Sequence, residues 1–165
     1  MEKIDFTMII RQIEKQDNKI LAEIIRQCFR DFNAPTAGTV YEDPTTDNLF
    51  ALFQKEKSIL WVAELDGKVV GCCGIFPKED LSSDCVELVK FYVESEARGK
   101  GIGKMLMEQN IQSAKTLGYK KIYIESLPEF DKAVSLYIKT GFKELDHPLG
   151  KSSHTGCSVW MEREI

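Results

Sequence analysis

Apolar residues recur along the chain at two spacings, every second position and every three to four positions, and these spacings predict its elements. Residues 6–13 hold isoleucines among polar residues, which predicts a first strand, and Asp17 follows as the N-cap of a helix. That helix ends at residues 33–35, where the sequence is Asn-Ala-Pro. Its apolar stripe consists of Ile20, Leu21, Ile24, Ile25, Cys28 and Phe32.

The middle of the chain predicts a short helix, a hairpin and a further strand. Thr45 or Thr46 stands where it would cap the short helix. Asp66 and Gly67 lie between two strand-like stretches, and such a pair is typical of a tight hairpin turn. The next stretch, CVELVKFYV, is rich in β-branched and aromatic residues, so it predicts another strand. The three strands span residues 59–65, 68–76 and 85–93.

The second half of the chain predicts helices that alternate with strands. Gly118 supplies the stop for a helix with one apolar stripe, and a strand follows, which makes a β-α-β unit. Pro128 and Glu129 open another helix, which Gly141 ends. The first of these helices spans residues 102–117, and the strands span residues 121–125, 142–145 and 157–162.

The order of these elements, β-α-α-β-β-β-α-β-α-β-β, places hairpins first and a crossover later. It predicts the α/β class, with a central twisted mixed sheet of about seven strands and about four helices distributed over both faces. The chain has 165 residues, of which 43% are hydrophobic and 29% are charged. This composition suits one packed domain over residues 1–165.

The charge balance and the cysteines narrow the classes of partner. The net charge of −4 leaves no broad cationic surface, so we expect neither nucleic acid nor a membrane as a partner. No apolar run is long enough for a membrane span and the opening segment is unlike a signal peptide, so we expect a cytoplasmic location. Five cysteines without a Cys-x-x-Cys spacing are typical of a reducing compartment. His154 and Cys157 lack a second ligand pair, so we expect no metal.

A glycine-rich segment between a predicted strand and a predicted helix carries the best candidate chemistry. It reads RGKGIGK at residues 98–104. Glycines let backbone amides approach a ligand, and the first N–H groups of a helix favour an anion, so the segment predicts a pyrophosphate cradle. The spacing lacks the first glycine and the Ser or Thr of a Walker A loop, and it lacks the third glycine of a dinucleotide fingerprint. These two classes of nucleotide site are therefore excluded here.

Four stretches in order resemble the GNAT superfamily of acyl-CoA-dependent N-acetyltransferases. The pattern Arg-x-x-Gly-x-Gly at residues 98–103 is similar to motif A of that family. The hairpin WVAELDGKVVGCCGI, the strand VELVKFYV and the stretch LYIKTGF at residues 136–142, preceded by Ala133, are similar to three further family segments. The resemblance spans most of the chain and implies a single GNAT-like domain.

The resemblance implies that acetyl-CoA is the co-substrate and that two segments hold it. The strand end would pair its backbone with the pantetheine arm, and the loop would hold the pyrophosphate through its amides and basic side chains. In this family that strand and the one at residues 121–125 splay apart, which opens a slot for the thioester. The implied cofactor-binding residues are Phe91, Tyr92, Val93, Arg98, Gly99, Lys100, Gly101, Ile102, Gly103 and Lys104.

Tyr137 and Glu87 are the catalytic residues that the resemblance implies. Tyr137 matches a tyrosine that gives a proton to the departing thiolate, and a phenol with a pKa of about 10 stays protonated at neutral pH. Glu87 matches the base of the histone acetyltransferase branch, and Val86, Leu88 and Val89 are expected to desolvate it and raise its pKa. A core aromatic and a structural carboxylate are the competing interpretations. Weaker candidates for the base are Glu125, Glu129 and His154.

The leading functional hypothesis is transfer of an acetyl group to a primary amine of a small molecule, by direct attack in a ternary complex. A peptide acceptor has only the position of Glu87 in its favour, and a non-catalytic acyl-CoA sensor is the alternative. In the family the acceptor site comes from the segments equivalent to residues 31–47 and 146–156, and homodimers are common. Candidate acceptor residues are Tyr41, Glu42, Asp43, Asp146, His147 and His154.

One position departs from the family pattern. Many members have an asparagine that contacts the cofactor three residues before the helix alanine, where this chain has Phe130. The resemblance therefore leaves the contacts of the pantetheine arm open at this position.

Overall fold

The computed structural model describes residues 5–151 and 155–165, and its centre is one seven-stranded sheet in the order β1-β2-β3-β4-β5-β7-β6. The strands are β1 (Met8–Gln12), β2 (Ile59–Leu65), β3 (Lys68–Phe76), β4 (Cys85–Val93), β5 (Lys121–Ser126), β6 (Lys143–Leu145) and β7 (Val159–Glu164). The helices are α1 (Asn18–Asp31), α2 (Leu49–Leu52), α3 (Ile102–Thr116) and α4 (Asp131–Lys139). Short 3-10 turns are η1 (Lys15–Asp17), η2 (Pro44–Asp47) and η3 (Ser95–Ala97).

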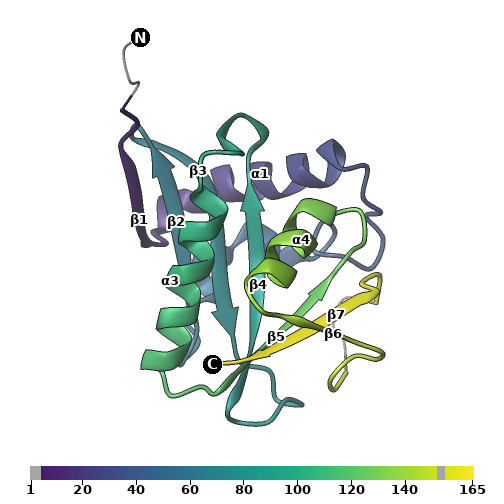
Figure 1. Cartoon of the computed structure of the whole chain (residues 1–165). Helices are drawn as coiled ribbons and strands as arrows, with labels where there is room; N and C mark the ends of the chain where they lie inside the picture. Colours follow the sequence, from purple (N-terminus) through teal and green to yellow (C-terminus); the bar gives the residue numbers. More distant parts are fainter. Residues whose placement is uncertain (1–4, 152–154) are drawn as a thin grey trace.

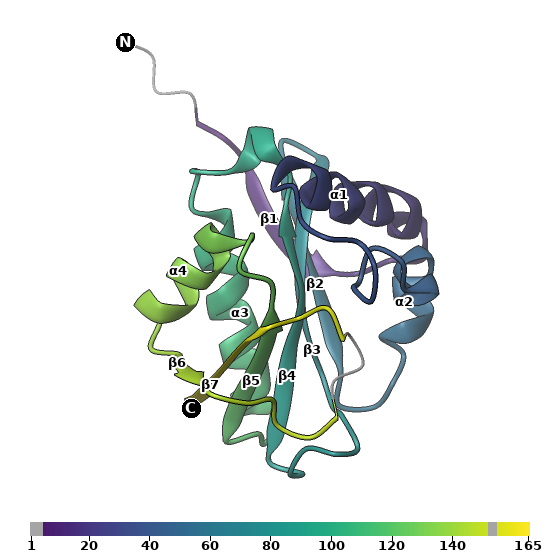
Figure 2. The same ribbon diagram turned by 90° about the vertical axis from the view of Figure 1, so that its right-hand side faces the viewer.

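The sheet is mixed and both of its faces are covered. Strands β4 and β5 pair in parallel, whereas the other neighbouring strands pair antiparallel. Helices α1 and α2 lie on one face and α3 and α4 on the other, which Figure 1 shows face-on and Figure 2 edge-on. The expected class, with seven strands and four helices on two faces, is confirmed.

Two apolar cores result from the alternation of side chains along the central strands. Cys72 and Cys73 illustrate it, because these neighbours are both fully buried and belong to different cores. The core beneath α1 includes Leu21, Ile25, Phe29, Leu60, Val62 and Cys72. The core beneath α3 and α4 includes Cys73, Ile75, Val86, Leu88, Leu106 and Met107.

A bulge in β4 marks the place where the sheet opens. Between the pairs Gly74–Val89 and Cys72–Tyr92, strand β3 has one residue and β4 has two, Lys90 and Phe91. Lys90 takes a left-handed backbone conformation with φ 55°. The parallel pairing of β4 with β5 ends at Leu88, opposite Ile124. Beyond the bulge β4 therefore continues without β5 beside it, as the expected splay requires.

Several element boundaries differ from those predicted. The last helix begins at Asp131 because residues 127–130 form a turn, closed by the Phe130 N–H donating to the Leu127 carbonyl at 3.1 Å. Neither threonine caps α2, whose first turn is capped instead by Asn48. The final strand, expected at residues 157–162, runs Val159–Glu164, and the first strand is shorter than predicted.

Candidate functional site

Two cavities meet where β4 and β5 diverge. The larger, of about 230 Å³, lies between the glycine-rich loop, the end of β4 and α4. The smaller, of about 70 Å³, lies deeper, between β4, the end of β5 and α4. The two share Phe91, Tyr92, Phe130 and Ala133 in their walls. These four residues therefore form the wall between the two cavities, which we call the outer and the inner cavity.

The glycine-rich loop gives the outer cavity an anion-binding rim. Gly99 and Gly101 have φ values of 78° and 82°, a conformation that favours glycine, and Gly101 is the N-cap of α3. No side chain caps this helix. The N–H groups of its first turn therefore lack a capping acceptor and remain able to bind an anion at the loop. A Cβ built on Gly99 or Gly101 would meet nothing within 4 Å, which leaves both backbone flanks open to a ligand. This geometry suits a diphosphate.

Arg98 anchors the loop instead of extending into it. Its guanidinium donates to the Val93 carbonyl at 2.8 Å, pairs with Asp31 at 3.2 Å and lies 4.6 Å from the centre of the Phe32 ring. The side chain thus ties the end of α1 to the end of β4 while lining the outer cavity. Its charge is already paired with a carboxylate, and the expectation that this charge supplements the cradle stays a prediction.

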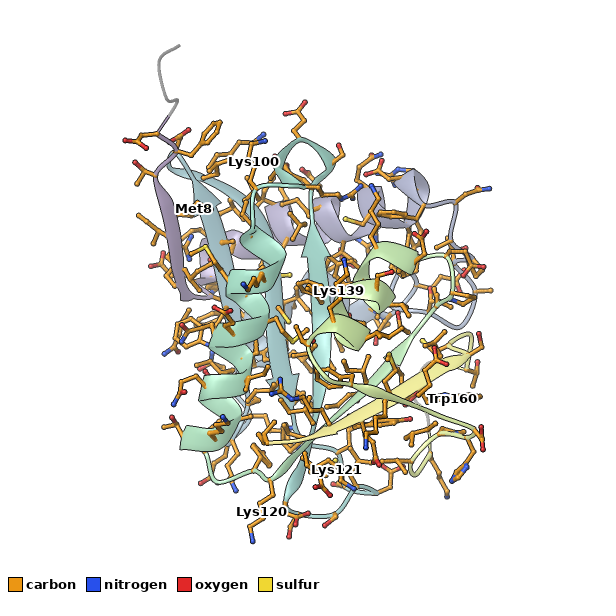
Figure 3. The ribbon with its side chains drawn as sticks, in the orientation of Figure 1. Met8, Lys100, Lys120, Lys121, Lys139 and Trp160 are labelled. Carbon is orange, nitrogen blue, oxygen red and sulfur yellow. The ribbon has the colours of Figure 1, made fainter. Side chains whose placement is uncertain are left out.

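The two lysines of the loop, unlike Arg98, lie outside the lining of the outer cavity. Lys100 donates to the Glu96 carbonyl at 2.6 Å and its ammonium lies over Phe6. Lys104 is exposed and lies 4.0 Å from Glu108 on the next turn of α3. Figure 3 places Lys100 at the end of the sheet where α3 begins, with Lys120 and Lys121 at the opposite end. The backbone amides of the loop, rather than these side chains, form the rim that the structure describes.

The end of β4 offers a partly free backbone edge to the outer cavity, although the Val93 carbonyl already accepts from the Arg98 guanidinium. The Glu94 N–H donates to the Val70 carbonyl at 2.8 Å, and Val93 is paired with Gly71. Because successive residues of an antiparallel ladder point alternately toward and away from the partner, the backbone groups of Phe91 and Val93 point away from β3. They face the gap that β5 leaves, which is the arrangement expected for pairing with an extended ligand.

The inner cavity brings Glu87 and Tyr137 together. Glu87 reaches it from β4, before the bulge, and Tyr137 reaches it from α4. Both side chains are buried, and Glu125 from β5 and Lys90 from the bulge share the lining. The two residues expected to be catalytic are thus part of one site although 50 positions separate them in the sequence.

Glu87 belongs to a buried group of charges. The Lys78 ammonium lies 3.4 Å from Glu87 and 3.3 Å from Glu125, so one lysine bridges two carboxylates. Burial raises the pKa of Glu87 to about 7, an effect that Lys78 opposes and Glu125 reinforces. A pKa in this range is that of a group able to accept a proton at neutral pH.

The source of the desolvation differs in part from the prediction. Val86 and Leu88 belong to the core on the opposite face of the sheet, because side chains of a strand alternate. Val89 lies on the same face as the inner cavity and lines it. Leu88 nevertheless reaches the lining of the inner cavity, so two of the three expected neighbours, Leu88 and Val89, lie beside Glu87 there and Val86 does not.

Tyr137 presents a neutral hydroxyl to the inner cavity. Its ring packs against Phe91 and Phe142, with centroids 5.9 and 6.0 Å away. Burial raises the pKa of Tyr137 well above its ordinary value, so the phenol stays protonated. Its side chain has no hydrogen bond among the residues described. The hydroxyl is therefore available to a ligand. Because its pKa is raised, it is better suited to donate a hydrogen bond than to release its proton completely.

Phe130 takes the place of the expected asparagine and forms part of the wall between the cavities. Its ring contacts Phe29, Phe32 and Tyr92, with centroids 5.1, 5.6 and 6.0 Å away. The resulting aromatic cluster fixes the N-terminal end of α4 to α1. An apolar ring thus stands where the family pattern has a polar contact.

The segments expected to form the acceptor site contribute only in part. Thr39 and Val40 line the inner cavity, and so does Cys157, just beyond the second segment. Asp43 lines a neighbouring groove, and Tyr41 packs on Phe29. Glu42, Asp146 and His147 are absent from the lining of either cavity, and His154 lies outside the described residues.

Sequence reasoning missed two lysines, Lys78 and Lys90. Lys78 follows β3 and becomes important only because it reaches both carboxylates. Lys90 stands in β4 where regular alternation would place it in the apolar core with Val86 and Leu88, and this misfit was the available signal.

Across residues 5–151 and 155–165, no group of three or more His, Cys, Asp and Glu side chains is arranged to hold a metal. No helix in the same ranges has the length and apolarity to cross a membrane.

Comparison with known proteins agrees with this geometry. Residues 19–142 match the model of the acetyltransferase (GNAT) family. An uncharacterized N-acetyltransferase of Escherichia coli, YjgM, is 34% identical over 95% of this chain and 95% of its own length. Human N-acetyltransferase 8 is 32% identical over 68% of this chain, but only 53% of that protein is covered.

Two solved structures illustrate the likeness in fold. An acetyltransferase of the GNAT family from Staphylococcus aureus superposes with a TM-score of 0.83 at 21% identity, over 96% of this chain and 99% of that one. The protein yncA of Salmonella typhimurium, solved with its cofactor acetyl-CoA, superposes with a TM-score of 0.75 at 20% identity, over 95% and 93% of the two chains.

Proposed function

The chain belongs to the GNAT family of acetyltransferases, and from that membership we propose that it transfers an acetyl group from acetyl-CoA to the primary amine of a small molecule, by direct attack in a ternary complex. The observation that carries the proposal is the inner cavity, in which a buried carboxylate and a neutral phenol face one space beside an anion-binding loop. The small volume of this cavity, about 70 Å³, favours a small amine over a folded protein surface.

Acetyl-CoA fits the outer cavity on the geometry of this chain. The amides of residues 98–104, with α3 behind them, would hold the diphosphate, and the free edge of Phe91 and Val93 would pair with the pantetheine arm. When bound, acetyl-CoA supplies the activated acetyl group. The protein contributes orientation, because the loop and the strand edge hold two ends of one ligand on a rigid frame.

Glu87 and Tyr137 would divide the movement of protons. An alkyl amine is mostly protonated at neutral pH, so it must lose a proton before it attacks, and Glu87 with a pKa of about 7 is able to accept it, directly or through water. Tyr137 would donate a hydrogen bond to the sulfur as negative charge develops there. The amine nitrogen bonds to the acetyl carbon and the carbon–sulfur bond breaks. The nitrogen then loses its second proton, the departing thiolate takes up one proton to leave as the thiol, and one proton is released overall through Glu87.

The test is release of free thiol over a panel of small primary amines. We expect Tyr137→Phe to lower kcat about 10- to 100-fold while the Kd of CoA stays within twofold, because Tyr137 lines the inner cavity, where the thioester would lie, and not the loop that would hold the diphosphate. Tyr119→Phe is the matched control, since Tyr119 is a buried tyrosine outside both cavities whose hydroxyl donates to the Lys57 carbonyl. No thiol release with any amine, in protein that binds CoA, would contradict the proposal.

The other hypotheses fare less well. The non-catalytic sensor loses support because the relatives are named N-acetyltransferases and because the candidates for acid and base share one cavity. A peptide acceptor keeps only the position of Glu87 in its favour. The cytoplasmic location and the homodimer stay predictions.

A further inference from the structure

Lys90 is the one buried cation of the inner cavity that the mechanism does not use. Only 7% of Lys90 is exposed, yet it lines the cavity beside Glu87. Among the residues that the structure describes, its ammonium has no hydrogen bond and no ion pair within 4.0 Å. The two nearby carboxylates on β4 and β5 are already bridged by Lys78.

The bulge explains why a lysine occupies this place. Regular alternation would direct residue 90 into the apolar core with Val86 and Leu88. The extra residue of the bulge and the left-handed backbone of Lys90 turn its side chain to the face of Glu87 instead. A non-glycine residue in this conformation carries backbone strain, and such strain is concentrated at functional sites.

The Lys90 side chain is largely removed from water and its ammonium faces the cavity without an ion-pair partner among the described residues, which points to a partner that arrives with the substrate. Removing a charge from water costs several kcal/mol unless an opposite charge and hydrogen bonds replace the water. Burial lowers the pKa of Lys90, and the carboxylates of Asp43 and Glu87 oppose that effect from a distance. An anion that binds in the cavity would complete the site by hydrogen bonding to Lys90.

The diphosphate of the coenzyme is not that anion. Its cradle at residues 98–104 lines the outer cavity, and Lys90 is absent from the lining there. The inner cavity receives the acceptor, so an anionic group at Lys90 belongs to the acceptor. The cavity then offers Glu87 for the amine and Lys90 for the anion, and both come from one strand only three residues apart.

We propose that the acceptor is an amine that also carries a carboxylate, and that Lys90 binds this carboxylate while the amine lies at Glu87. The proposal rests on the proposed acetyl transfer and names its substrate class. Strand residues rise about 3.3 Å each, so the two α-carbons lie within about 10 Å of each other. That separation suits a small amino acid, with its two charged groups held at one end of a cavity of about 70 Å³.

The experiment compares amino acids with their own carboxamides. α- and ω-amino acids are each paired with the carboxamide, which keeps the amine and replaces the carboxylate by a neutral group, and thiol release gives kcat/KM for both members. The carboxamide holds more free amine at neutral pH, so chemistry alone would favour it. We expect the opposite, with at least one amino acid preferred over its carboxamide about 10- to 100-fold.

Two variants connect that preference to Lys90. We expect Lys90→Met to reduce the ratio of the two kcat/KM values by about 10- to 100-fold. We expect Lys68→Met to leave the ratio unchanged, because Lys68 is an exposed lysine that pairs with Glu94 and lines neither cavity. Damage to folding would lower both values together and would not change their ratio. The wild-type comparison requires no variant, so it decides the matter even when Lys90→Met does not fold.

The outcomes separate the two proposals. Turnover of carboxamides as fast as of every amino acid would overturn the carboxylate at Lys90 and leave acetyl transfer intact, and so would an unchanged ratio in Lys90→Met. No thiol release with any compound, in protein that binds CoA, would overturn acetyl transfer and this inference with it.

Discussion

At the scale of the residue, the two carboxylates bridged by Lys78 decide how the site responds to pH. Glu87 and Glu125 are both buried at the ammonium of Lys78, but they enter the site from different strands. Burial sets the pKa of Glu87 at about 7, and the negative charge of Glu125 contributes to keeping it there. A change at Glu125 should therefore tune the base, whereas a change at Glu87 should remove it.

Glu87→Gln tests the base. In the wild type we expect kcat to rise with pH between about 6 and 8, because Glu87 accepts a proton only when it is ionised and its pKa is about 7. Glu87→Gln should lower kcat about 100- to 10,000-fold and flatten this rise. Steady-state kinetics from pH 5.5 to 9 measure both effects.

Glu125→Gln is the matched control for that measurement. It removes the like charge that raises the pKa of Glu87, so the rise of kcat should move to lower pH without a large loss of its plateau. A flat profile in Glu125→Gln together with a shifted one in Glu87→Gln would show that the roles of the two carboxylates are reversed.

Residue by residue, the sequence predicted which two candidate catalytic residues meet better than it predicted their surroundings. Tyr137 and Glu87 could be named from the resemblance, and the structure places them in one cavity. The bridging role of Lys78 could not be predicted, since it depends on a contact between β3 and β5 across β4. Lys90 was hidden by a bulge, which reverses the face of a side chain and has no reliable signature in a single sequence.

At the scale of the element, the loop before α3 combines a backbone requirement with a binding role. Gly101 has the left-handed conformation in which a helix N-cap meets the loop, and Gly118 has the same conformation just after the C-cap at the other end of α3. Both positions have open space where a Cβ would stand. A side chain would therefore cause similar backbone strain at the two positions, whereas only Gly101 lines the outer cavity.

Gly101→Ala and Gly118→Ala therefore separate binding from folding. Each should lower the free energy of unfolding by roughly 1 kcal/mol, because alanine disfavours a positive φ. Only Gly101→Ala should also raise the Kd of CoA, by about tenfold, since its methyl group stands at the rim that holds the diphosphate. Calorimetry and urea denaturation provide the two readouts, and an equal loss of CoA affinity in both variants would contradict the cradle.

Elements with strong local signals were predicted to the residue, and those that depend on tertiary contacts were not. The hairpin around Asp66 and Gly67 and the strand Cys85–Val93 match the prediction because turn chemistry and β-branched residues define them locally. The start of α4 was wrong because Phe130 packs on Phe29 and Phe32, which holds the preceding turn out of the helix. The short pairing of β6 with β7 likewise shifted the last strand.

At the scale of the whole molecule, the coenzyme would join two parts that the sheet does not connect. Strands β4 and β5 stop pairing at Leu88, so the C-terminal half of β4 is held on that side mainly by side chains from α4. A ligand paired with this edge would replace the missing strand. Binding should then increase both the stability of the fold and the protection of this edge.

We expect CoA at 100 times its Kd to stabilise the folded state by about 2.7 kcal/mol. For a chain of this size that free energy corresponds to a rise in Tm of about 5 to 11 °C. Hydrogen exchange at Phe91 and Val93 should slow on binding, because their N–H groups face the gap. Pantetheine, which lacks the diphosphate, should give a smaller rise. No change in Tm with millimolar CoA would contradict this account.

The ion pair of Arg98 has a consequence for how the empty protein behaves among copies of itself. An unpaired strand edge is a template on which a foreign extended segment can add, and such addition leads to aggregation. Here the guanidinium already occupies the Val93 carbonyl, the last of β4, so the vacant backbone groups are those of Phe91 and the N–H of Val93, and the edge ends at a charged side chain. We expect so short an edge to accept a small extended ligand but to offer little template for a second copy of the chain.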